Sequence, residues 1–405
     1  MNKCLHLLAA IAGCLFFTAC FNNKPKEDKS AFQSQNTLTA IPYNGIVTID
    51  LTKKYPKKDF TIDDTNREFI LLETTNEILA DKDFKIQFVS DKRIIATNSS
   101  RGDVFIFGRD GKVISHFNQM GNSGMEYLTI LSIVFDEDKE EIFVVDNLQK
   151  NRCLVFSEDG KFIRQFNFPS NSYIDQLYNF DDQTLLAYNR YRHKGTDEIN
   201  QRMPYVLLSK KDGSVVSRLD ISFDKRNSER HAIRVEGGAI PISITYKNII
   251  KCGQEFIISD ISSDTVFVLK QDKKLTPLFE RTPSVSFAEN FISLSVSFKT
   301  EQYLFFEAIS YNWNELEAQW RKKQELPPLP VNYFAYDLHT GQIFSTDHSP
   351  TFSKDSPICI SIDMYHVEHL VEHLEKGELQ GELKQIAKKI KGEDINPIVI
   401  ITKYK

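Results

Sequence analysis

The chain has 405 residues, of which 41% are hydrophobic and 26% are charged, the balance of a globular protein with a sizeable core. The formal net charge is -5 and no long basic stretch occurs, which argues against a nucleic-acid partner because phosphate binding needs clustered Lys and Arg. Phe 30 and Tyr 15 against Trp 2 favour pleated, half-buried strands, where flat rings pack across neighbouring chains.

The first 19 residues have the composition of a secretory signal peptide. Lys3 supplies a positive charge, residues 5–17 are mostly apolar, and the composition turns polar directly after Cys20. Such a short run does not span a bilayer, which takes about 20 apolar residues. Residues 17–20 resemble a bacterial lipobox, so we expect lipidation of Cys20; the alternative is an ordinary signal peptide next to an incidental cysteine.

Residues 20–39 are rich in Asn, Lys, Ser and Gln without an apolar period, which predicts a flexible tether. Lys26, Glu27 and Asp28 look similar to the acidic sorting signals of some Bacteroidetes lipoproteins. Together with Cys20 they predict an outer membrane lipoprotein, either periplasmic or surface-exposed, whose lipid anchor makes the membrane a partner.

Six cysteines occur, three of them within the first 20 residues. The others, Cys153, Cys252 and Cys359, stand about 100 residues apart, unlike a zinc site or a disulfide-dense scaffold. We expect small buried hydrophobes. One disulfide between two of the three is the alternative.

From residue 40 to residue 405 the chain repeats a unit of four short strands. In the clearest unit, runs at 133–135, 141–146 and 152–156 precede Asp159-Gly160 and a fourth run at 161–166. Asp-Gly between apolar runs is a strong hairpin signal, for which we expect a type I′ turn. Similar turns occur near residues 110, 212, 272 and 340. Their spacing of roughly 50 to 70 residues approaches the blade period of a β-propeller with insertions.

Such units stack around an axis because one four-stranded sheet does not bury both faces alone. Strand-like segments remain at 45–51, 67–73, 358–362 and 397–403. Combined, they would build a further blade and close the ring without a long bare edge. We therefore predict an all-β fold, a single six-bladed β-propeller over 40–405, closed by N- and C-terminal strands that share a blade. Five or seven blades are the alternatives.

Two segments depart from the β pattern and predict short helical insertions. Residues 311–324 have helical composition and are ended by the proline-rich stretch 326–330; we expect this helix to cap one face of the propeller as an insertion in the fifth blade. Residues 365–390 carry a helical apolar stripe, interrupted at Gly377 and Gly381.

Three segments resemble the six-bladed β-propeller lipoproteins of Bacteroides and relatives, which are related in shape to NHL-repeat proteins. They are Phe69–Thr74, Gly121–Tyr127 and Glu393–Val399. The second departs at Met125 from the Gly-Pro-Gly-Glu-Tyr-like segment usual in that family. The resemblance spans nearly the whole chain and implies the fold, but it implies little about activity.

Two patterns resemble motifs of ligand binding or catalysis. Residues 121–127 form a Gly-containing loop, but they lack the spacing of a phosphate-binding loop; we expect a blade-to-blade connection in which Glu126 bonds free backbone N–H groups. His369, Glu372 and His373 match the H-x-x-E-H pattern of inverted zinc peptidases. Little chain follows to supply a further ligand, so we expect a solvated helix face, with catalytic or adventitious metal binding as the alternatives. We predict no catalytic residue, metal or cofactor.

One polar cluster stands in predicted loops beside the third and fourth blades. Its candidate ligand-binding residues are Arg190, Tyr191, Arg192, His193, His231 and Arg234. Arg beside Tyr suits carboxylate or sugar recognition through bidentate hydrogen bonds and stacking, and loops tend to carry function. The alternative is a set of exposed loop charges without a ligand.

We expect a non-enzymatic binding module for a glycan, peptide or protein partner. The alternative is a propeller enzyme, a hydrolase or lyase, with a metal in the central channel. Carboxylates and imidazoles that converge on the axis would favour this alternative.

Overall fold

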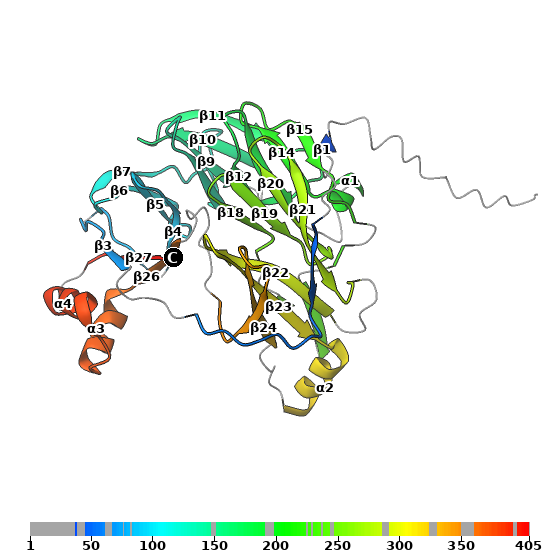
Figure 1. Ribbon diagram of the computed structural model, residues 1–405. Coiled ribbons are helices and arrows are strands. Elements are labelled where there is room, and N and C mark those ends of the chain that lie inside the picture. Colours follow the sequence, from blue (N-terminus) through cyan, green and yellow to red (C-terminus); the bar gives the residue numbers. More distant parts are fainter. Residues whose placement is uncertain are drawn as a thin grey trace, which may run out of the picture. The chain divides into compact units, whose positions relative to one another are not determined.

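The computed structural model describes residues 37–404, apart from 39–44, 61–66, 76, 82, 147–150, 191–197, 224–225, 228–229, 236–237, 244–246, 286–290, 324–329, 350–359 and 392–394. These residues belong to one compact unit, Asn36–Lys405. Its strands form six sheets, arranged as blades in a ring, and one separate hairpin (Figure 1). The predicted six-bladed β-propeller is confirmed.

Each of the first five blades contains four antiparallel strands that follow one another along the chain. Blade 1 contains β4 (Phe84–Val89), β5 (Arg93–Asn98), β6 (Asp103–Gly108) and β7 (Val113–Asn118). Blade 2 contains β8 (Ser132–Asp136), β9 (Glu141–Asp146), β10 (Arg152–Ser157) and β11 (Phe162–Asn167). Blade 3 contains β12 (Ile174–Asn179), β13 (Thr184–Asn189), β14 (Tyr205–Ser209) and β15 (Val215–Leu219). Blade 4 contains β18 (Ile249–Cys252), β19 (Glu255–Ser259), β20 (Thr265–Lys270) and β21 (Leu275–Thr282). Blade 5 contains β22 (Phe291–Lys299), β23 (Tyr303–Tyr311), β24 (Val331–Asp337) and β25 (Ile343–Thr346).

Blade 6 closes the ring with strands from both ends of the chain, as predicted. It contains β26 (Ile360–Tyr365), β27 (Ile398–Lys403) and β3 (Arg67–Leu71), in the order β26-β27-β3. All its pairs are antiparallel. The ring is therefore fastened by backbone hydrogen bonds between segments more than 300 residues apart.

The segment 45–51 does not join blade 6, so that part of the prediction is wrong. Within it, β2 (Val47–Asp50) pairs in parallel with β21, at the outer edge of blade 4. Lys57 then bridges Ser345 at the outer edge of blade 5. We call residues 45–60 the strap, because they run along these two outer edges (Figure 1). Before the strap, β1 (Thr37–Leu38) adds to the edge strand β15 of blade 3 in the same way.

The strands differ in burial according to their place in the blade. Every residue of β5 after Arg93 is buried, since both faces of a central strand meet neighbouring blades. The outermost strand β11 instead alternates between exposed and less exposed positions. The inner strands therefore read as continuous apolar runs, and the outer ones as alternating patterns.

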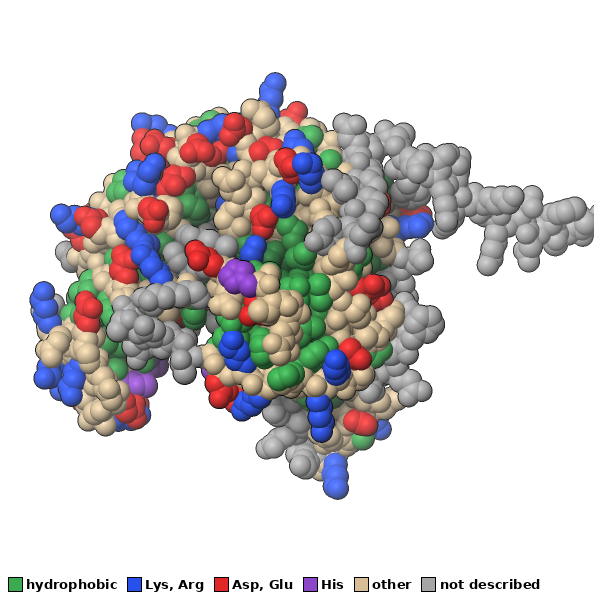
Figure 2. Space-filling view, in the orientation of Figure 1, with side chains coloured by type: hydrophobic (Ala, Val, Ile, Leu, Met, Phe, Trp, Pro, Cys, Tyr) green, Lys and Arg blue, Asp and Glu red, His purple; other side chains and the backbone are tan. Residues whose placement is uncertain are grey.

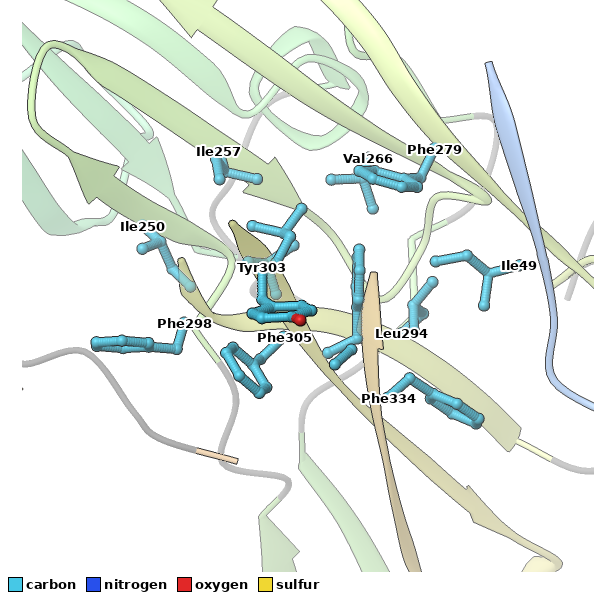
Figure 3. Close-up of a cluster of buried hydrophobic side chains, with 14 of the residues drawn as sticks. Ile49, Ile250, Ile257, Val266, Phe279, Leu294, Phe298, Tyr303, Phe305 and Phe334 are labelled. Carbon is cyan, nitrogen blue, oxygen red and sulfur yellow. The ribbon is translucent and has the colours of Figure 1, made fainter. Parts of the chain in front are cut away.

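The core lies between neighbouring blades, in clusters of buried apolar side chains. Between blades 4 and 5, Ile257 and Phe279 face Leu294 and Phe334, and Ile49 of β2 joins them (Figure 3). Comparable clusters join blades 1 and 2, 2 and 3, 3 and 4, and 6 and 1. Burial of apolar surface, at roughly 25 cal/mol per Å², is the main term that holds the blades together.

Blades 5 and 6 meet differently, at a junction that we call the seam. Among the described residues, no buried apolar cluster joins these two sheets. The strap covers blade 5 there, where the Phe60 ring centroid lies 4.9 Å from those of Tyr303 and Phe305. Tyr404, directly after β27, reaches Phe298 of β22 with ring centroids 4.7 Å apart.

Both predicted helical segments are confirmed as insertions. Between β23 and β24 of blade 5 lies α2 (Trp313–Lys323). Between β26 and β27 lie α3 (Val367–Glu375) and α4 (Gly381–Ile390), whose apolar side chains cover one face of blade 6. A short further helix, α1 (Glu198–Arg202), precedes β14.

The hairpin turns lie where predicted, but the type I′ assignment is wrong. In the turn of blade 2, Gly160 N–H donates to Ser157 O and Ser157 N–H donates to Lys161 O. Gly160 has φ +79 while Asp159 keeps a negative φ, and the register shifts beside it between Val155 and Phe156. This is a type I turn followed by a left-handed residue and a bulge, which needs one Gly rather than two positive φ values.

Two of the three predicted core cysteines are confirmed. Cys153 and Cys252 are both buried, and no disulfide joins one to the other. Burial raises the pKa of Cys153 well above its usual range, which makes it an inert core residue. Cys359 lies outside the described residues.

Candidate functional site

The connections between strands differ between the two ends of the ring. Consecutive strands are antiparallel, so turns within a blade alternate between the ends. At the hairpin end, first-to-second and third-to-fourth strand turns such as 90–92 and 158–161 are tight. At the other end, which we call the connection face, lie the second-to-third strand connections and the links between blades.

Three long connections gather on the connection face, over blades 3 to 5. They are 190–204, which holds α1; 220–248, which holds the hairpin of β16 (Arg230–Val235) and β17 (Gly238–Ser243); and 312–330, which holds α2. The helix α2 lies beside β16. A further long connection, 366–397 in blade 6, folds back onto its own sheet instead. Elaboration beyond the minimal propeller is thus concentrated on one face, where function tends to reside.

A buried arginine ties the first two of these connections to blade 3. Arg226 is 7% exposed, and its guanidinium lies 5.2 Å from the Tyr188 ring centroid. Its Nη2 donates to Tyr188 Oη at 2.5 Å, and its Nη1 donates to Asn189 O at 3.0 Å. The root of loop 220–248 is therefore fixed to the last two residues of β13, immediately before Arg190.

A second polar group continues this network into blade 4. Tyr205 is fully buried, and its hydroxyl donates to Asp260 Oδ2 at 2.7 Å. Asn248 Nδ2 donates to Tyr205 Oη at 3.1 Å. Burial raises the pKa of Tyr205 well above its usual range, and the adjacent carboxylate of Asp260 adds to that rise. Tyr205 therefore stays a neutral donor, and the base of the face is rigid.

A third anchor holds the link between blades 4 and 5. The Arg281 side chain is nearly completely buried, and its Nε lies 3.1 Å from Asp264 Oδ1. The same carboxylate accepts hydrogen bonds from Val285 N at 2.7 Å and from Ser284 Oγ at 2.5 Å. Burial lowers the pKa of Arg281, an effect that Asp264 opposes. The pair fixes the direction in which the chain leaves β21.

The structure places three of the six predicted ligand-binding residues on the connection face. Arg190 follows β13 and is partly buried, and its backbone N donates to Tyr173 O at 2.9 Å. His231 and Arg234 are both on β16, opposite Ile242 and Ala239 of β17. Tyr191, Arg192 and His193 lie outside the described residues. The prediction that these residues bind a ligand stays a prediction.

Sequence reasoning missed the buried polar residues beneath the loops. Tyr188 and Tyr205 stand in apolar strands and read as core aromatics. Arg226 and Asp260 stand alone in loops without a motif. The tyrosine hydroxyls were the sequence signal that could have indicated this polar network, because a buried Tyr hydroxyl usually has a hydrogen-bond partner.

The loop 121–127 is the structural connection that we predicted. Glu126 Oε2 accepts a hydrogen bond from Ser123 N at 2.8 Å. Arg152 Nη1 donates to Gly124 O at 3.2 Å, and its Nε donates to Asp146 Oδ2 at 3.0 Å. The carbonyls and N–H groups of the loop are thus used by the protein itself.

The H-x-x-E-H residues lie on α3 with partners of their own. Glu372 Oε1 lies 2.7 Å from Lys376 Nζ, and His373 Nδ1 lies 2.9 Å from Glu378 Oε2. His369 is exposed. Within the part of the chain that the structure describes, no three His, Cys, Asp or Glu side chains are grouped as metal ligands.

Acidic and basic side chains are interspersed on the surface that Figure 2 shows, both over the blades and over α3 and α4. Among the residues coloured there, neither sign of charge forms a broad area. Recognition on such a surface relies on directed hydrogen bonds rather than on a long-range field.

The fold and the face together define the class, a six-bladed β-propeller with its elaborated loops on one side of the ring. The chain belongs to the family described as "Domain of unknown function (DUF4934)", whose model matches residues 46–403. No curated protein matches the sequence. In the described part of the chain, no helix has the length and apolar content to cross a membrane.

Two solved structures from Bacteroides are similar in fold. A "Putative exported protein" of Bacteroides fragilis NCTC 9343 aligns with a TM-score of 0.58 at 16% identity, over 89% of this chain and 100% of that one. A member of the DUF4221 family from Bacteroides vulgatus aligns with a TM-score of 0.46 at 10% identity, over 85% and 97%. The predicted likeness to six-bladed propeller proteins of Bacteroides is confirmed at the level of the fold.

Proposed function

We propose that this protein is an exported, lipid-anchored binding module whose recognition surface is the connection face over blades 3 to 5. Its partner is a glycan, a peptide or a protein. The observation that carries the proposal is the concentration of long connections on this one face, above a buried polar network. A rigid ring that presents variable loops is suited to recognition, because little order is lost on binding.

The buried network supports a role beyond stability. Asn189, Arg226 and Tyr205 are nearly inaccessible to solvent. Polar groups at such depth stabilise a fold less than apolar side chains of equal size would. What they add is a fixed geometry for the chain on either side. Here they hold the roots of 190–204 and 220–248, the two connections that carry the predicted ligand-binding residues.

The proposed cellular location rests on the signal-peptide composition and on the similarity in fold to an exported protein. Residues 1–19 have signal-peptide composition, and Cys20 follows a small residue in a lipobox-like context. The similar fold described as exported supports the same compartment. We infer an outer membrane lipoprotein, held through lipids on Cys20 and a tether over residues 20–39, and either periplasmic or surface-exposed.

A screen of glycan and peptide arrays with the protein lacking residues 1–20 tests the binding role. The variant combining Arg190→Ala and Arg192→Ala, and separately Arg234→Ala, should weaken the strongest hit about tenfold without changing thermal unfolding. Lys161→Ala is the control, because this side chain is 81% exposed in a hairpin-end turn. Equal binding by all variants would refute the assignment of the face.

A fractionation experiment tests the anchor. Cys20→Ser should move the protein from the membrane fraction to the soluble fraction, because two or more acyl chains supply the anchoring energy. Unchanged membrane association would refute lipidation at Cys20.

A further inference from the structure

A second candidate site lies on blade 6, at the seam. One face of its sheet packs on blade 1, and the other is covered by α3 and α4 over only part of its area. On this second face Arg67, Phe69, Asp363, Ile400 and Thr402 form the floor of a pocket of about 1010 Å³. Ligand pockets commonly measure about 300–1,000 Å³, so this one is large enough for a ligand of several rings.

The turn between α3 and α4 forms a wall of the pocket. His373 Nδ1 lies 2.9 Å from Glu378 Oε2, and the His373 ring meets Tyr365 edge-on with centroids 6.0 Å apart. Gln380 and Glu382 continue this wall. At the rim, Tyr404 Oη lies 3.3 Å from Ser361 Oγ.

The pocket carries ionisable side chains of both signs. Asp363 is reached by solvent through the pocket, where partial burial raises the pKa of its carboxyl and Arg67 opposes that rise. Glu378 is paired with His373. The lining thus offers carboxylate, amide and hydroxyl groups as hydrogen-bonding partners.

Flat apolar surfaces lie next to these polar groups. Phe69 and Tyr365 present aromatic rings on the same side of the sheet, and Tyr404 stands at the edge. Aromatic rings beside polar side chains in one pocket match a ligand whose own faces are apolar and whose rim carries hydroxyls.

We propose that the blade 6 pocket binds a neutral saccharide of a few sugar units. Sugar hydroxyls can donate hydrogen bonds to the carboxylate of Asp363, and they can both donate to and accept from the amide of Gln380. The C–H face of a sugar ring packs on an aromatic ring. An anionic ligand would meet three carboxylates, on Asp363, Glu378 and Glu382. A cationic ligand would have to compete with Arg67 and His373 for the first two.

This site is separate from the long connections over blades 3 to 5. The pocket is lined by residues of blade 6 and of the turn between α3 and α4, whereas Arg190 follows β13 of blade 3 and β16 lies in the link from blade 3 to blade 4. The inference therefore does not depend on the proposed function, and variants on either surface report on one of them alone.

Calorimetric titration tests the inference on the protein lacking residues 1–20. The probes are neutral trisaccharides of glucose, mannose, galactose and N-acetylglucosamine, with spermidine and a lysine-rich peptide as cationic probes. At least one trisaccharide should bind, and Asp363→Ala and Gln380→Ala should each weaken it about tenfold or more. Lys388→Ala, an exposed position on α4 outside the pocket, and Arg190→Ala should leave its affinity unchanged.

The outcomes are distinguishable. Trisaccharide binding that Arg190→Ala abolishes and Asp363→Ala spares would place the sugar on the connection face and overturn the pocket assignment. Binding of the cationic probes alone would overturn the ligand class, and binding of no probe would overturn the site. Asp363→Asn keeps the size of the side chain and removes its charge, so loss of binding in this variant with unchanged thermal unfolding separates recognition from misfolding.

Discussion

The guanidinium of Arg226 lies on the ring of Tyr188 and also donates to its hydroxyl, at a depth where neither side chain is more than 7% exposed. The contact links a loop between two blades to the end of a strand within one of them. It joins the candidate recognition surface to the core of the propeller.

Arg226→Leu should lower the free energy of unfolding by about 2 kcal/mol, because Asn189 O and Tyr188 Oη would each lose a buried donor. Urea denaturation followed by fluorescence measures the change. Lys161→Ala, at an exposed turn, should be nearly neutral. If the two variants unfold alike, the network contributes no stability.

The strand β3 closes the ring both by pairing with β27 and by packing its apolar side chains against blade 1. Ile70 is 5% exposed and packs in the cluster between blades 6 and 1, while its neighbour Leu71 is 38% exposed. Ile70→Ala should cost about 2–4 kcal/mol, because it leaves a cavity. Leu71→Ala tests the same strand from its other face and should cost much less. If both variants lost a similar free energy of unfolding, the backbone pairing of β3, rather than the packing of Ile70, would be what stabilises the closed ring.

The sequence was sufficient to predict this closure but not the path of the strap. Strand-like segments left over at both ends could only complete a blade together, and β3 and β27 do so. β2 adds in parallel to an outer edge, a pairing without a turn or any local pattern. The polar network was equally hidden, because Tyr188 and Tyr205 have the pattern of core residues while Arg226 and Asp260 come from distant loops.

Gly121 provides a test of the loop 121–127. A Cβ on Gly121 would lie 2.1 Å from Glu126 Oε2, whereas one on Gly124 would meet nothing within 4 Å. Gly121→Ala should therefore displace Glu126 and its bond to Ser123 N, lowering the free energy of unfolding by about 1–2 kcal/mol. Gly124→Ala is the matched control. Equal thermal midpoints for both variants would contradict the role of Glu126.

Asp103 gives the protein a predictable acid response. Burial by itself would raise the pKa of Asp103, but hydrogen bonds from Asn118, Arg101 and His116 outweigh it and hold this pKa below its usual 3.8. The stability that it contributes is therefore present above pH 3.8 and is lost as the pH falls through the lowered value.

Urea midpoints between pH 6 and pH 2.5 check this response. Asp103→Asn should be less stable than the native chain near neutral pH, and its stability should fall less steeply with acid. Asp272→Asn, at a fully exposed turn where solvent screens the charge, should follow the native curve closely. A native-like acid slope for Asp103→Asn would exclude Asp103 as a contributor.

Hydrogen–deuterium exchange with and without the strongest hit of the array screen tests the central claim most directly. The proposed binding face predicts that added protection concentrates in 190–204 and 220–248 and extends to 312–330, while the hairpin-end turns exchange as before. Protection confined to the hairpin-end turns, with those three connections unchanged, would contradict it.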